Sequence, residues 1–378
     1  MSFRYGSGIN KPGFDPLAAP TSTTVYNLYA WGDNNYGQLG LGNVNYYSSP
    51  KQVGGTETWQ QIAGGGYIFT AGIKNNGTLW SWGANDFGQL GLGNTTYYSS
   101  PKQIGALTNW LNISTGYKYA VAIKTDGTMW SWGRNQFGQL GLTTYGTNYS
   151  SPKQIGSLTT WSKVVACQVH VHAIKTDGTL WGWGRNNNGQ LGLGNITNYS
   201  SPKQVGALTN WLYLCNGGYY NTLAIKTDGT LWTWGDNAYG QLGNGVNTTS
   251  YSSPKQVGAL TTWASSAGGV YLATAIKTNG TLWAWGFNSR GQLGQGNTIS
   301  RSSPVQVGAL TNWFKTVNTG QFVLAVKTDG TLWSWGQNNF GQLGLGNQTY
   351  YSSPKQVGSN TTWKVPNSTG GATAVMLA

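Results

Sequence analysis

Ala173-Ile-Lys-Thr-Asp-Gly-Thr-Leu-Trp-Gly-Trp-Gly184, followed by Asn186-Asn-Asn-Gly-Gln-Leu-Gly-Leu-Gly194, is the stretch of sequence that decides the fold. It recurs with small changes along the chain, six times complete and once without its front half. The intervals between successive Trp-Gly steps are 50 or 51 residues, and the steps fall at Trp31, Trp82, Trp132, Trp183, Trp234, Trp285 and Trp335. So regular a period predicts copies of one supersecondary unit, stacked or arranged in a ring.

The clearest local signal in each copy is a hairpin. In residues 69–74, short side chains alternate with apolar ones. The turn sequence Asn75-Asn76-Gly77 follows, and residues 78–82 show alternation again. Asn-Gly or Asp-Gly between alternating segments predicts a β-hairpin, because Gly adopts the positive φ that such turns require. We expect a short strand before the hairpin near residues 62–63. A further strand is expected after it, within residues 99–105, where Pro101 favours a strand start or a sheet edge.

Four short strands per copy, repeated seven times with Trp and Gly at fixed places, predict an all-β, seven-bladed β-propeller. The pattern Gly-Thr-Leu-Trp-Ser-Trp-Gly-x-Asn-x-x-Gly-Gln-Leu-Gly resembles the repeat of the regulator of chromosome condensation family, over residues 25–378. The resemblance implies a seven-bladed propeller. It is less specific for activity, because one fold serves several unrelated roles.

The two ends of the repeat region are complementary. The first copy begins at its third strand, near residue 25. The last copy ends within its second strand, at residues 372–378. We therefore expect one composite blade, with inner strands from residues 363–378 and outer strands from residues 25–53. This pairing closes the ring and removes exposed sheet edges. The predicted domains are an extended N-terminal arm, residues 1–24, and the propeller, residues 25–378.

Most of the chain's aromatic and charged residues belong to the repeat. All 20 Trp residues fall at repeat positions and are predicted to form the core between blades. The net charge of +13 comes largely from two sets of lysines, one at the hairpin turns and one after Ser-Ser-Pro. These lysines either protect outer edges and keep the protein soluble, or attract an anionic partner.

The sequence offers no catalytic, cofactor or metal site. Of nine acidic residues, seven occupy hairpin turns or follow a Trp-Gly step, which leaves no paired carboxylates. His170 and His172 share one face of a strand, with Cys167 nearby in sequence, and are interpreted as ordinary strand positions rather than metal ligands. Cys167 and Cys215 are not expected to form a disulfide. Neither a signal peptide nor a transmembrane segment is predicted.

The loops before Ser-Ser-Pro vary most between copies and form a candidate binding rim. Their exposed candidates are Tyr46, Tyr97, Tyr145, Arg301 and Tyr350. Tyr, Asn, Thr and Arg together are typical of adaptable recognition surfaces. The alternative is that the last Tyr of each loop packs on its blade, while the remaining residues form a solvated turn.

The arm, residues 1–24, carries sizeable apolar groups in a segment that cannot form its own core. A flexible linker would hold fewer aromatic residues. We expect the arm to dock on a neighbouring subunit or another protein of an assembly, or else to fold back on its own propeller. The candidate contact residues are Phe3, Arg4, Tyr5, Ile9, Lys11, Phe14 and Leu17.

The near-identity of the copies and the Asn-, Thr-, Gly- and Tyr-rich composition resemble structural proteins of tailed bacteriophages. The resulting functional prediction is a non-enzymatic virion protein of the tail, fibre or capsid surface, attached by its arm to virion proteins or to itself. An anionic host glycan is a candidate ligand, whereas nucleic acid and membrane insertion are not expected. The alternative is a stand-alone protein- or glycan-binding propeller, soluble and outside a virion. Nucleotide exchange on a small GTPase, which the family resemblance implies, ranks third.

Overall fold

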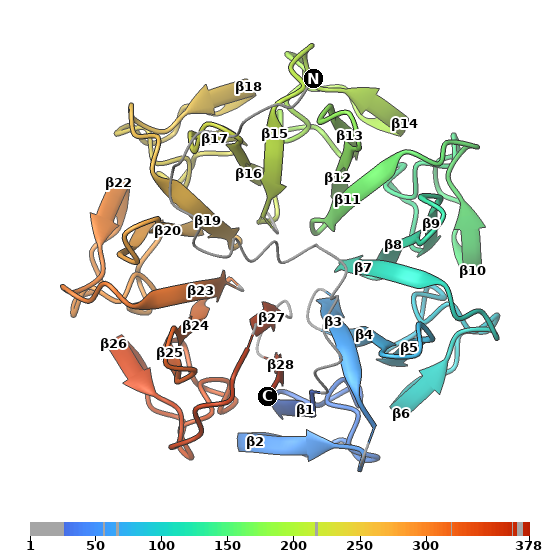
Figure 1. Cartoon of the computed structure of the whole chain (residues 1–378), viewed down its shortest axis with the longest axis horizontal. Helices are drawn as coiled ribbons and strands as arrows, with labels where there is room; N and C mark the ends of the chain where they lie inside the picture. Colours follow the sequence, from blue (N-terminus) through green and yellow to red (C-terminus); the bar gives the residue numbers. More distant parts are fainter. Residues whose placement is uncertain are drawn as a thin grey trace, which may run out of the picture.

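The structure, a computed structural model, describes residues 26–55, 57–65, 68–215, 218–318, 320–364, 366–368 and 373–378. The predicted arm, including its seven candidate contact residues, lies outside these ranges. The described strands form seven four-stranded antiparallel sheets, arranged as blades around a central axis (Figure 1). The predicted all-β, seven-bladed propeller is therefore confirmed.

Each blade runs from an inner strand near the axis to an outer strand at the circumference (Figure 1). Blade 2 contains β3 (Trp59–Gly65), β4 (Phe69–Lys74), β5 (Leu79–Gly83) and β6 (Tyr98–Gln103). Blade 3 contains β7 (Trp110–Gly116), β8 (Tyr119–Lys124), β9 (Met129–Gly133) and β10 (Tyr149–Gln154). Blade 4 contains β11 (Trp161–Ala166), β12 (His170–Lys175), β13 (Leu180–Gly184) and β14 (Tyr199–Gln204).

The next three blades repeat this order along the chain. Blade 5 contains β15 (Trp211–Leu214), β16 (Asn221–Lys226), β17 (Leu231–Gly235) and β18 (Tyr251–Gln256). Blade 6 contains β19 (Trp263–Gly268), β20 (Leu272–Lys277), β21 (Leu282–Gly286) and β22 (Arg301–Gln306). Blade 7 contains β23 (Trp313–Asn318), β24 (Phe322–Lys327), β25 (Leu332–Gly336) and β26 (Tyr351–Gln356).

Blade 1 is the composite blade that the two half-copies predict. Its strand order is β2 (Tyr47–Val53), β1 (Leu28–Gly32), β28 (Thr373–Leu377) and β27 (Pro366–Ser368), from outside to inside. β1 and β28 pair antiparallel over five residues, from Leu28 opposite Leu377 to Gly32 opposite Thr373. The first and last described strands thus close the ring side by side.

The hairpin turn explains why Asp or Asn, Gly and Thr recur together. In blade 2, Asn76 Oδ1 accepts hydrogen bonds from Thr78 N at 3.2 Å and Thr78 Oγ1 at 2.6 Å. Thr78 Oγ1 in turn accepts one from Trp80 Nε1 at 2.8 Å. Gly77 has φ 76° and lies so close to the Thr108 carbonyl that a Cβ would stand 2.0 Å from its oxygen. Glycine is therefore required there by backbone conformation and by space.

A ring of tryptophans joins every blade to the one before it. Each Trp of a Trp-Gly step is fully buried, and its Nε1 donates to the carbonyl of the Gln in the preceding Gly-Gln-Leu-Gly loop. The bond measures 2.8–3.0 Å in all seven cases, as in Trp82 to Gln38. The last bond, from Trp31 to Gln342, links blade 1 to blade 7. The predicted tryptophan core thus also supplies directional bonds between blades.

A second ring of bonds connects the same loops to the outer strand of the next blade. Gly42 N donates to Ser99 O at 2.8 Å, and equivalent bonds of 2.7 or 2.8 Å occur at the other six junctions. The last of them runs from Gly346 N to Ser48 O. The donor is a glycine with positive φ everywhere except at Thr143, which has φ 65°. Thr143 therefore keeps the bond in a backbone region that disfavours β-branched residues.

The hairpin lysines are packed into the blades. Each Nζ lies 3.6–3.9 Å from the centre of the first Trp ring of its own Trp-x-Trp-Gly strand, as Lys74 does over Trp80. Lys124, Lys226 and Lys327 are buried. Cation–π attraction and packing of the lysine stem therefore give this set a structural role that the sequence did not indicate. The lysines after Ser-Ser-Pro lie exposed on the outer strands.

Among the described residues, no helix has the length and the apolar character needed to cross a membrane.

Candidate functional site

The propeller has two unlike faces. The hairpin turns and the blade-to-blade linkers lie at one end of the strands, which we call the turn face. The Gly-Gln-Leu-Gly loops and the connections between first and second strands lie at the other end, which we call the loop face. Because the loop residues contact the following blade, substitutions there change the surface at blade junctions.

Aromatic and cationic side chains gather on the loop face of blades 2 to 6. They come from three variable positions of the repeat: before the second strand, after the Trp-Gly step, and before Gly-Gln. We call this set the arc, and it consists of Phe87, Tyr117, Lys118, Arg134, Phe137, Arg185, Tyr219, Tyr220, Tyr239, Tyr271 and Phe287.

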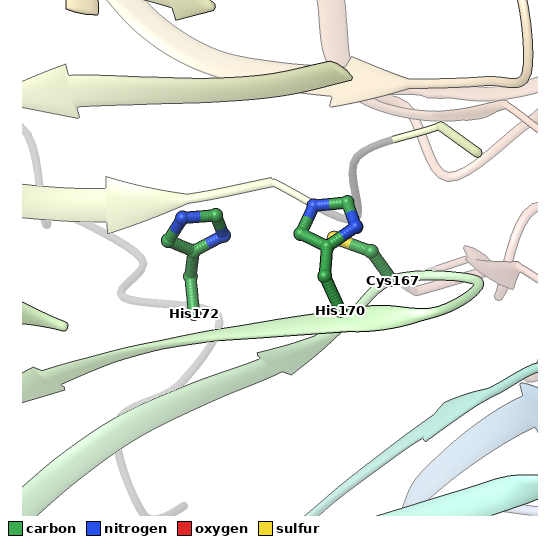
Figure 2. A group of neighbouring side chains, drawn as sticks. All are labelled: Cys167, His170 and His172. Carbon is green, nitrogen blue, oxygen red and sulfur yellow. The ribbon is translucent and has the colours of Figure 1, made fainter. Parts of the chain in front are cut away.

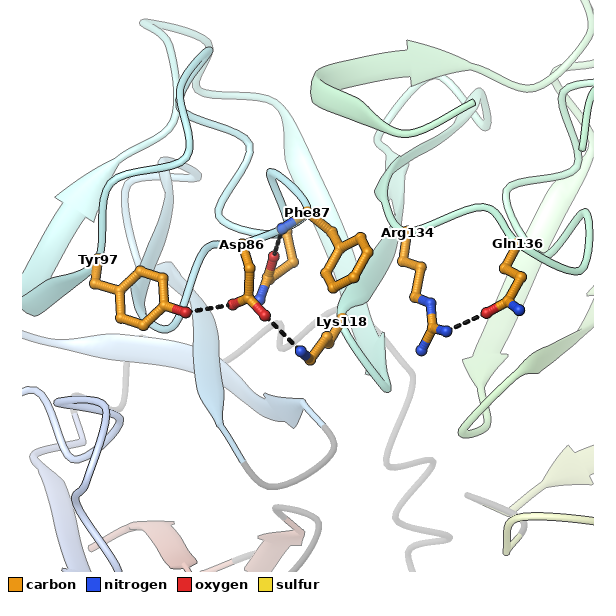
Figure 3. Close-up of polar contacts among 7 residues, drawn as sticks. Asp86, Phe87, Tyr97, Lys118, Arg134 and Gln136 are labelled. Atoms are coloured by element: carbon orange, nitrogen blue, oxygen red, sulfur yellow. Dashed lines mark hydrogen bonds and ion pairs between the residues drawn. The ribbon is translucent and has the colours of Figure 1, made fainter. Parts of the chain in front are cut away.

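The junction of blades 2 and 3 holds one aromatic ring between two cations. Figure 3 shows Phe87 between Lys118 and Arg134. Lys118 Nζ lies 4.8 Å and the Arg134 guanidinium 5.2 Å from the centre of the Phe87 ring. Arg134 also lies 5.8 Å from the Tyr117 ring and donates a hydrogen bond to Gln136. These contacts hold the guanidinium in place at the surface.

Lys118 is neutralised within this junction. Its Nζ forms an ion pair with Asp86, whose carboxylate also accepts a hydrogen bond from Tyr97 Oη at 2.7 Å (Figure 3). Burial opposes ionisation of Asp86, but the bonds from Lys118 and Tyr97 outweigh it and lower the carboxyl pKa. The bond to Asp86, with some burial, raises the pKa of Tyr97 to about 12.

Arg185 repeats the arrangement at the next junctions. Its guanidinium lies 5.0 Å from the Phe137 ring and 5.1 Å from the Tyr220 ring. Burial raises the pKa of the adjacent Tyr219 hydroxyl, and the nearby charges of Arg134 and Arg185 partly offset that rise. The charges of Arg134 and Arg185 therefore both influence the Tyr219 hydroxyl, so the junctions that hold these two arginines form one electrostatic surface.

The far end of the arc is aromatic. The Tyr239 ring lies 4.7 Å from the Tyr271 ring and 4.8 Å from the Phe287 ring, centre to centre. Burial raises the Tyr271 pKa, with smaller contributions from Tyr239 and Tyr220. Tyr220 thus stands within electrostatic reach of both Arg185 and Tyr271.

Arg134 and Arg185 have no carboxylate partner among the described residues, where ion pairs form only between Lys74 and Glu57 and between Lys118 and Asp86. Both side chains are half-buried. A guanidinium that is stacked on aromatic rings and still offers its N–H fork suits a planar carboxylate. The arc can therefore hold acidic groups next to aromatic ones.

The predicted rim residues are spread around the circumference, and the structure does not bring them together. Tyr46 donates to Asn35 and packs on Phe340 of blade 7 at 5.6 Å. Tyr97 belongs to the Asp86 network. Tyr145 and Tyr350 are also exposed: Tyr145 donates to the Asn198 carbonyl at 3.0 Å, and the Tyr350 ring lies 5.6 Å from the guanidinium of Arg290.

Arg301, the remaining rim candidate, begins β22 and is half-buried, opposite Gly286. Its Nε is buried without a hydrogen-bond partner among the described residues.

The sequence did not predict the arc, because the predicted rim lies in the loops before Ser-Ser-Pro and the arc lies at other positions of the repeat. The signal lay in other columns of the repeat. After the Trp-Gly step, the copies carry Asp33, Ala84, Arg134, Arg185, Asp236, Phe287 and Gln337. The repeat is otherwise uniform, so such variety at one position indicates that the fold does not require a particular residue there.

Seven four-stranded blades, built from one repeat of 50 or 51 residues and bearing a variable loop face, define a repeat propeller with a recognition surface. The RCC1-like domain family matches residues 69–321, and the regulator of chromosome condensation (RCC1) repeat matches residues 27–71 and 329–376. The first match alone spans more than half of the chain. The chain therefore belongs to the RCC1-like domain family.

Individual proteins show the same relationship. The chain is 34% identical over 277 residues to the ultraviolet-B receptor UVR8 of Arabidopsis thaliana, an alignment that covers 71% of this chain and 62% of the receptor. Human WBSCR16 superposes with a TM-score of 0.84 at 20% identity, covering 94% of this chain and 99% of that one. Prp20p of Saccharomyces cerevisiae gives 0.82 at 19% identity, covering 94% and 92%. The two solved structures show similarity of fold alone.

Proposed function

We propose that this chain is a non-enzymatic, protein-binding propeller that takes an acidic, aromatic-containing segment of a partner protein on the arc. The observation that carries the proposal is the pair Arg134 and Arg185. Each guanidinium is stacked on aromatic rings and lacks a carboxylate partner among the described residues. Arg, Tyr and Phe are enriched at the cores of protein interfaces.

The relatives support a protein ligand. Prp20p is described with its binding to Gsp1p and histones, and yeast RCC1 (Prp20) is described bound to Kap60. UVR8 is a receptor of which this chain spans 62%, so its own activity is not carried over. A protein-binding role agrees with the stand-alone alternative that the sequence suggested.

The non-enzymatic part of the proposal rests on the acidic residues. Asp126, Asp177, Asp228 and Asp329 each accept hydrogen bonds from the Thr two residues later and close a hairpin turn. Asp86 is paired with Lys118. Carboxylates that are committed to turns and pairs are poorly placed for general acid–base chemistry.

The test is binding of a fluorescent twelve-residue peptide of alternating Glu and Tyr, measured by anisotropy at several salt concentrations. The variant Arg134→Glu/Arg185→Glu should lose at least about tenfold in affinity, because a buried charge contact is replaced by repulsion. The matched control, Lys102→Glu/Lys153→Glu, makes the same change in net charge on the outer strands of blades 2 and 3. It should bind within about twofold of the parent chain at physiological salt, where distant charges are screened.

Equal losses in the two variants would show that binding follows net charge and would overturn the assignment to the arc. If the peptide does not bind, but a sulfated hexasaccharide binds in an Arg134- and Arg185-dependent way, a glycan ligand is favoured instead. The virion role, attachment through residues 1–24 and nucleotide exchange on a small GTPase stay predictions.

A further inference from the structure

Blade 4 holds a buried group of soft metal-binding side chains. Cys167 follows β11 directly, and His170 and His172 lie on β12 with both rings on the same side (Figure 2). One ligand atom from each residue lies within 4.8 Å of the other two. Both imidazoles are fully buried, and Cys167 is 2% exposed. Within the part of the chain that the structure describes, no other His, Cys, Asp or Glu joins the group.

The hydrogen bonds fix the state of His170. Its Nε2 lies 3.1 Å from Thr222 Oγ1, whose single proton goes to the Gln190 carbonyl at 3.0 Å. Thr222 therefore acts as acceptor toward the ring, and His170 Nε2 carries the proton. His170 Nδ1 is left with a lone pair that is buried and has no hydrogen-bond partner among the described residues.

His172 is in the same state for a different reason. Its Nε2 lies 3.3 Å from the Leu191 carbonyl, which can only accept, so Nε2 carries the proton. Its Nδ1 is also buried, and no described residue hydrogen-bonds to it. A buried polar atom without a hydrogen-bond partner costs free energy of folding. A metal ion held by these side chains would explain why both Nδ1 atoms lack a hydrogen bond.

The neighbouring strand is adapted to His172. In blades 2, 3, 5 and 7 a Ser or Thr occupies the middle of the Trp-x-Trp strand and donates to the loop carbonyl, as Ser131 does to Leu140 at 2.7 Å. Blade 4 has Gly182 there, and a Cβ on it would meet the His172 ring at 3.0 Å. His172 takes over the missing donor and fills the space that the glycine leaves.

We propose that Cys167, His170 and His172 form a buried site for one monovalent copper ion, Cu⁺. Thiolate and imidazole are ligands that soft or borderline metals prefer. Metal–ligand distances near 2.0–2.3 Å place ligand atoms about 3.3–4 Å apart, so atoms within 4.8 Å need only small rotations. Three donors, with no fourth among the described residues, suit trigonal Cu⁺, whereas tetrahedral Zn²⁺ would need a further ligand such as water.

The net charge of the occupied site also favours Cu⁺ over Zn²⁺. Binding deprotonates the thiol, so Cu⁺ with one thiolate is neutral overall, while Zn²⁺ would leave one positive charge in a buried site. Burying an uncompensated charge is strongly unfavourable. The positions equivalent to Cys167, His170 and His172 in blade 3 are Gly116, Tyr119 and Val121, so that blade lacks the donor set.

The experiment is an anaerobic competition for Cu⁺ between the full chain and a chromogenic Cu⁺ chelator. We expect one Cu⁺ withheld per chain, one proton released, and one sulfur and two nitrogen ligands by X-ray absorption. The key variant is His172→Val/Gly182→Ser, which rebuilds the Val121 and Ser131 pair of blade 3 and so keeps a packing that the fold already contains. It should weaken Cu⁺ binding by more than the about 10–100-fold that loss of an outer-shell partner costs.

Cys167→Ser should weaken binding to a similar degree. Cys215→Ser, at the other buried cysteine, should leave it unchanged. Circular dichroism and the melting temperature establish that each variant is folded. Cu⁺ binding by the Val/Ser variant as tight as that of the parent chain, or no withheld Cu⁺ at all, would overturn the site. Retention of Zn²⁺ but not Cu⁺ in the same competition would overturn the choice of ion.

Discussion

At the scale of single residues, polar side chains set the shape of the long loops. Asn85 is fully buried, and its Oδ1 accepts from Leu90 N at 2.9 Å. Its Nδ2 donates to the carbonyls of Asn94 and Thr96, both at 3.0 Å. The Asn of the Asn-x-x-Gly-Gln motif therefore replaces a backbone ladder where the chain leaves the sheet.

Asn85→Asp tests this role with an almost isosteric change. The carboxylate would face two carbonyl oxygens in a buried site, so we expect a loss of about 2–4 kcal/mol in the free energy of unfolding. The matched control is Asn76→Asp, because Asp126 and Asp177 occupy the same turn position in other copies. Urea denaturation of both variants measures the difference. Equal stability would contradict the role of the Nδ2 donor.

Thr143→Gly should stabilise the protein. Thr143 has φ 65° and donates the same backbone bond that glycines donate at the other six junctions. Removing the side chain relieves strain of about 1–3 kcal/mol, partly offset by the greater entropy of glycine in the unfolded chain. We expect a net gain of about 1 kcal/mol in thermal or urea unfolding. Thr144→Gly is the control, and it should destabilise, because Thr144 Oγ1 accepts from Asn135. A lower melting temperature for Thr143→Gly would contradict the strain argument.

Cys215 should be unreactive in the native protein. Burial raises its thiol pKa to about 12. Since the folded pKa exceeds that of the unfolded chain, the contribution of this thiol to stability is complete below about pH 8.5. That contribution is lost as the pH rises toward 12. Iodoacetamide at pH 8 should label Cys215 only after unfolding in urea, as read by peptide mass spectrometry. Rapid labelling of the folded chain would refute this expectation.

At the scale of elements, the sequence predicts the blades well and the side-chain contacts between them poorly. The turn chemistry of Asn76-Gly77-Thr78 is local, so it specifies the hairpin wherever it occurs. The composite blade follows from the half-copies at the two ends, because the strands that the first copy lacks are those with which the last copy ends. Stacking of Lys74 on Trp80, or of Arg134 on Phe87, depends on which side chains the fold brings together. A single copy of the repeat contains no such information.

Deleting residues 373–378 removes β28 and tests the composite blade. β1 loses the partner that it pairs with over five residues, and blade 1 loses its connection to β27. We expect a large fall in melting temperature and a tendency to associate, because two sheet edges become unpaired. Deleting residues 1–24 is the control and should leave the melting temperature unchanged. A similar small effect of both deletions would contradict closure by strand pairing.

At the scale of the whole molecule, the closed ring makes the seven junctions equivalent. Trp31 donates to Gln342 across the join, and Trp183 donates to Gln139 within the continuous chain, both at 3.0 Å. In an open array of repeats each terminal repeat contacts only one neighbour and so lacks one stabilising interface. A closed ring has no terminal interface.

Trp31→Phe and Trp183→Phe should therefore destabilise the protein equally. Each change leaves a buried carbonyl without its donor, at a cost of about 1–3 kcal/mol. Trp181→Phe is the control, because Trp181 is only half-buried and donates to Thr179 of its own turn. Chemical denaturation compares the three. A markedly smaller effect of Trp31→Phe would show that the junction of blades 7 and 1 is weaker than the others.

The antiparallel pairing of β1 with β28 also determines how the ring responds to tension. The chain enters β1 at Leu28 and leaves β28 at Leu377, and these two residues face each other. Just outside them, Asn27 and Ala378 exchange hydrogen bonds of 3.0 and 3.1 Å. A force applied through the flanking segments would load this end of the ladder alone and break its bonds one after another, as in a zipper. The seam that completes the propeller is then the place where a mechanical load on the chain ends opens it first.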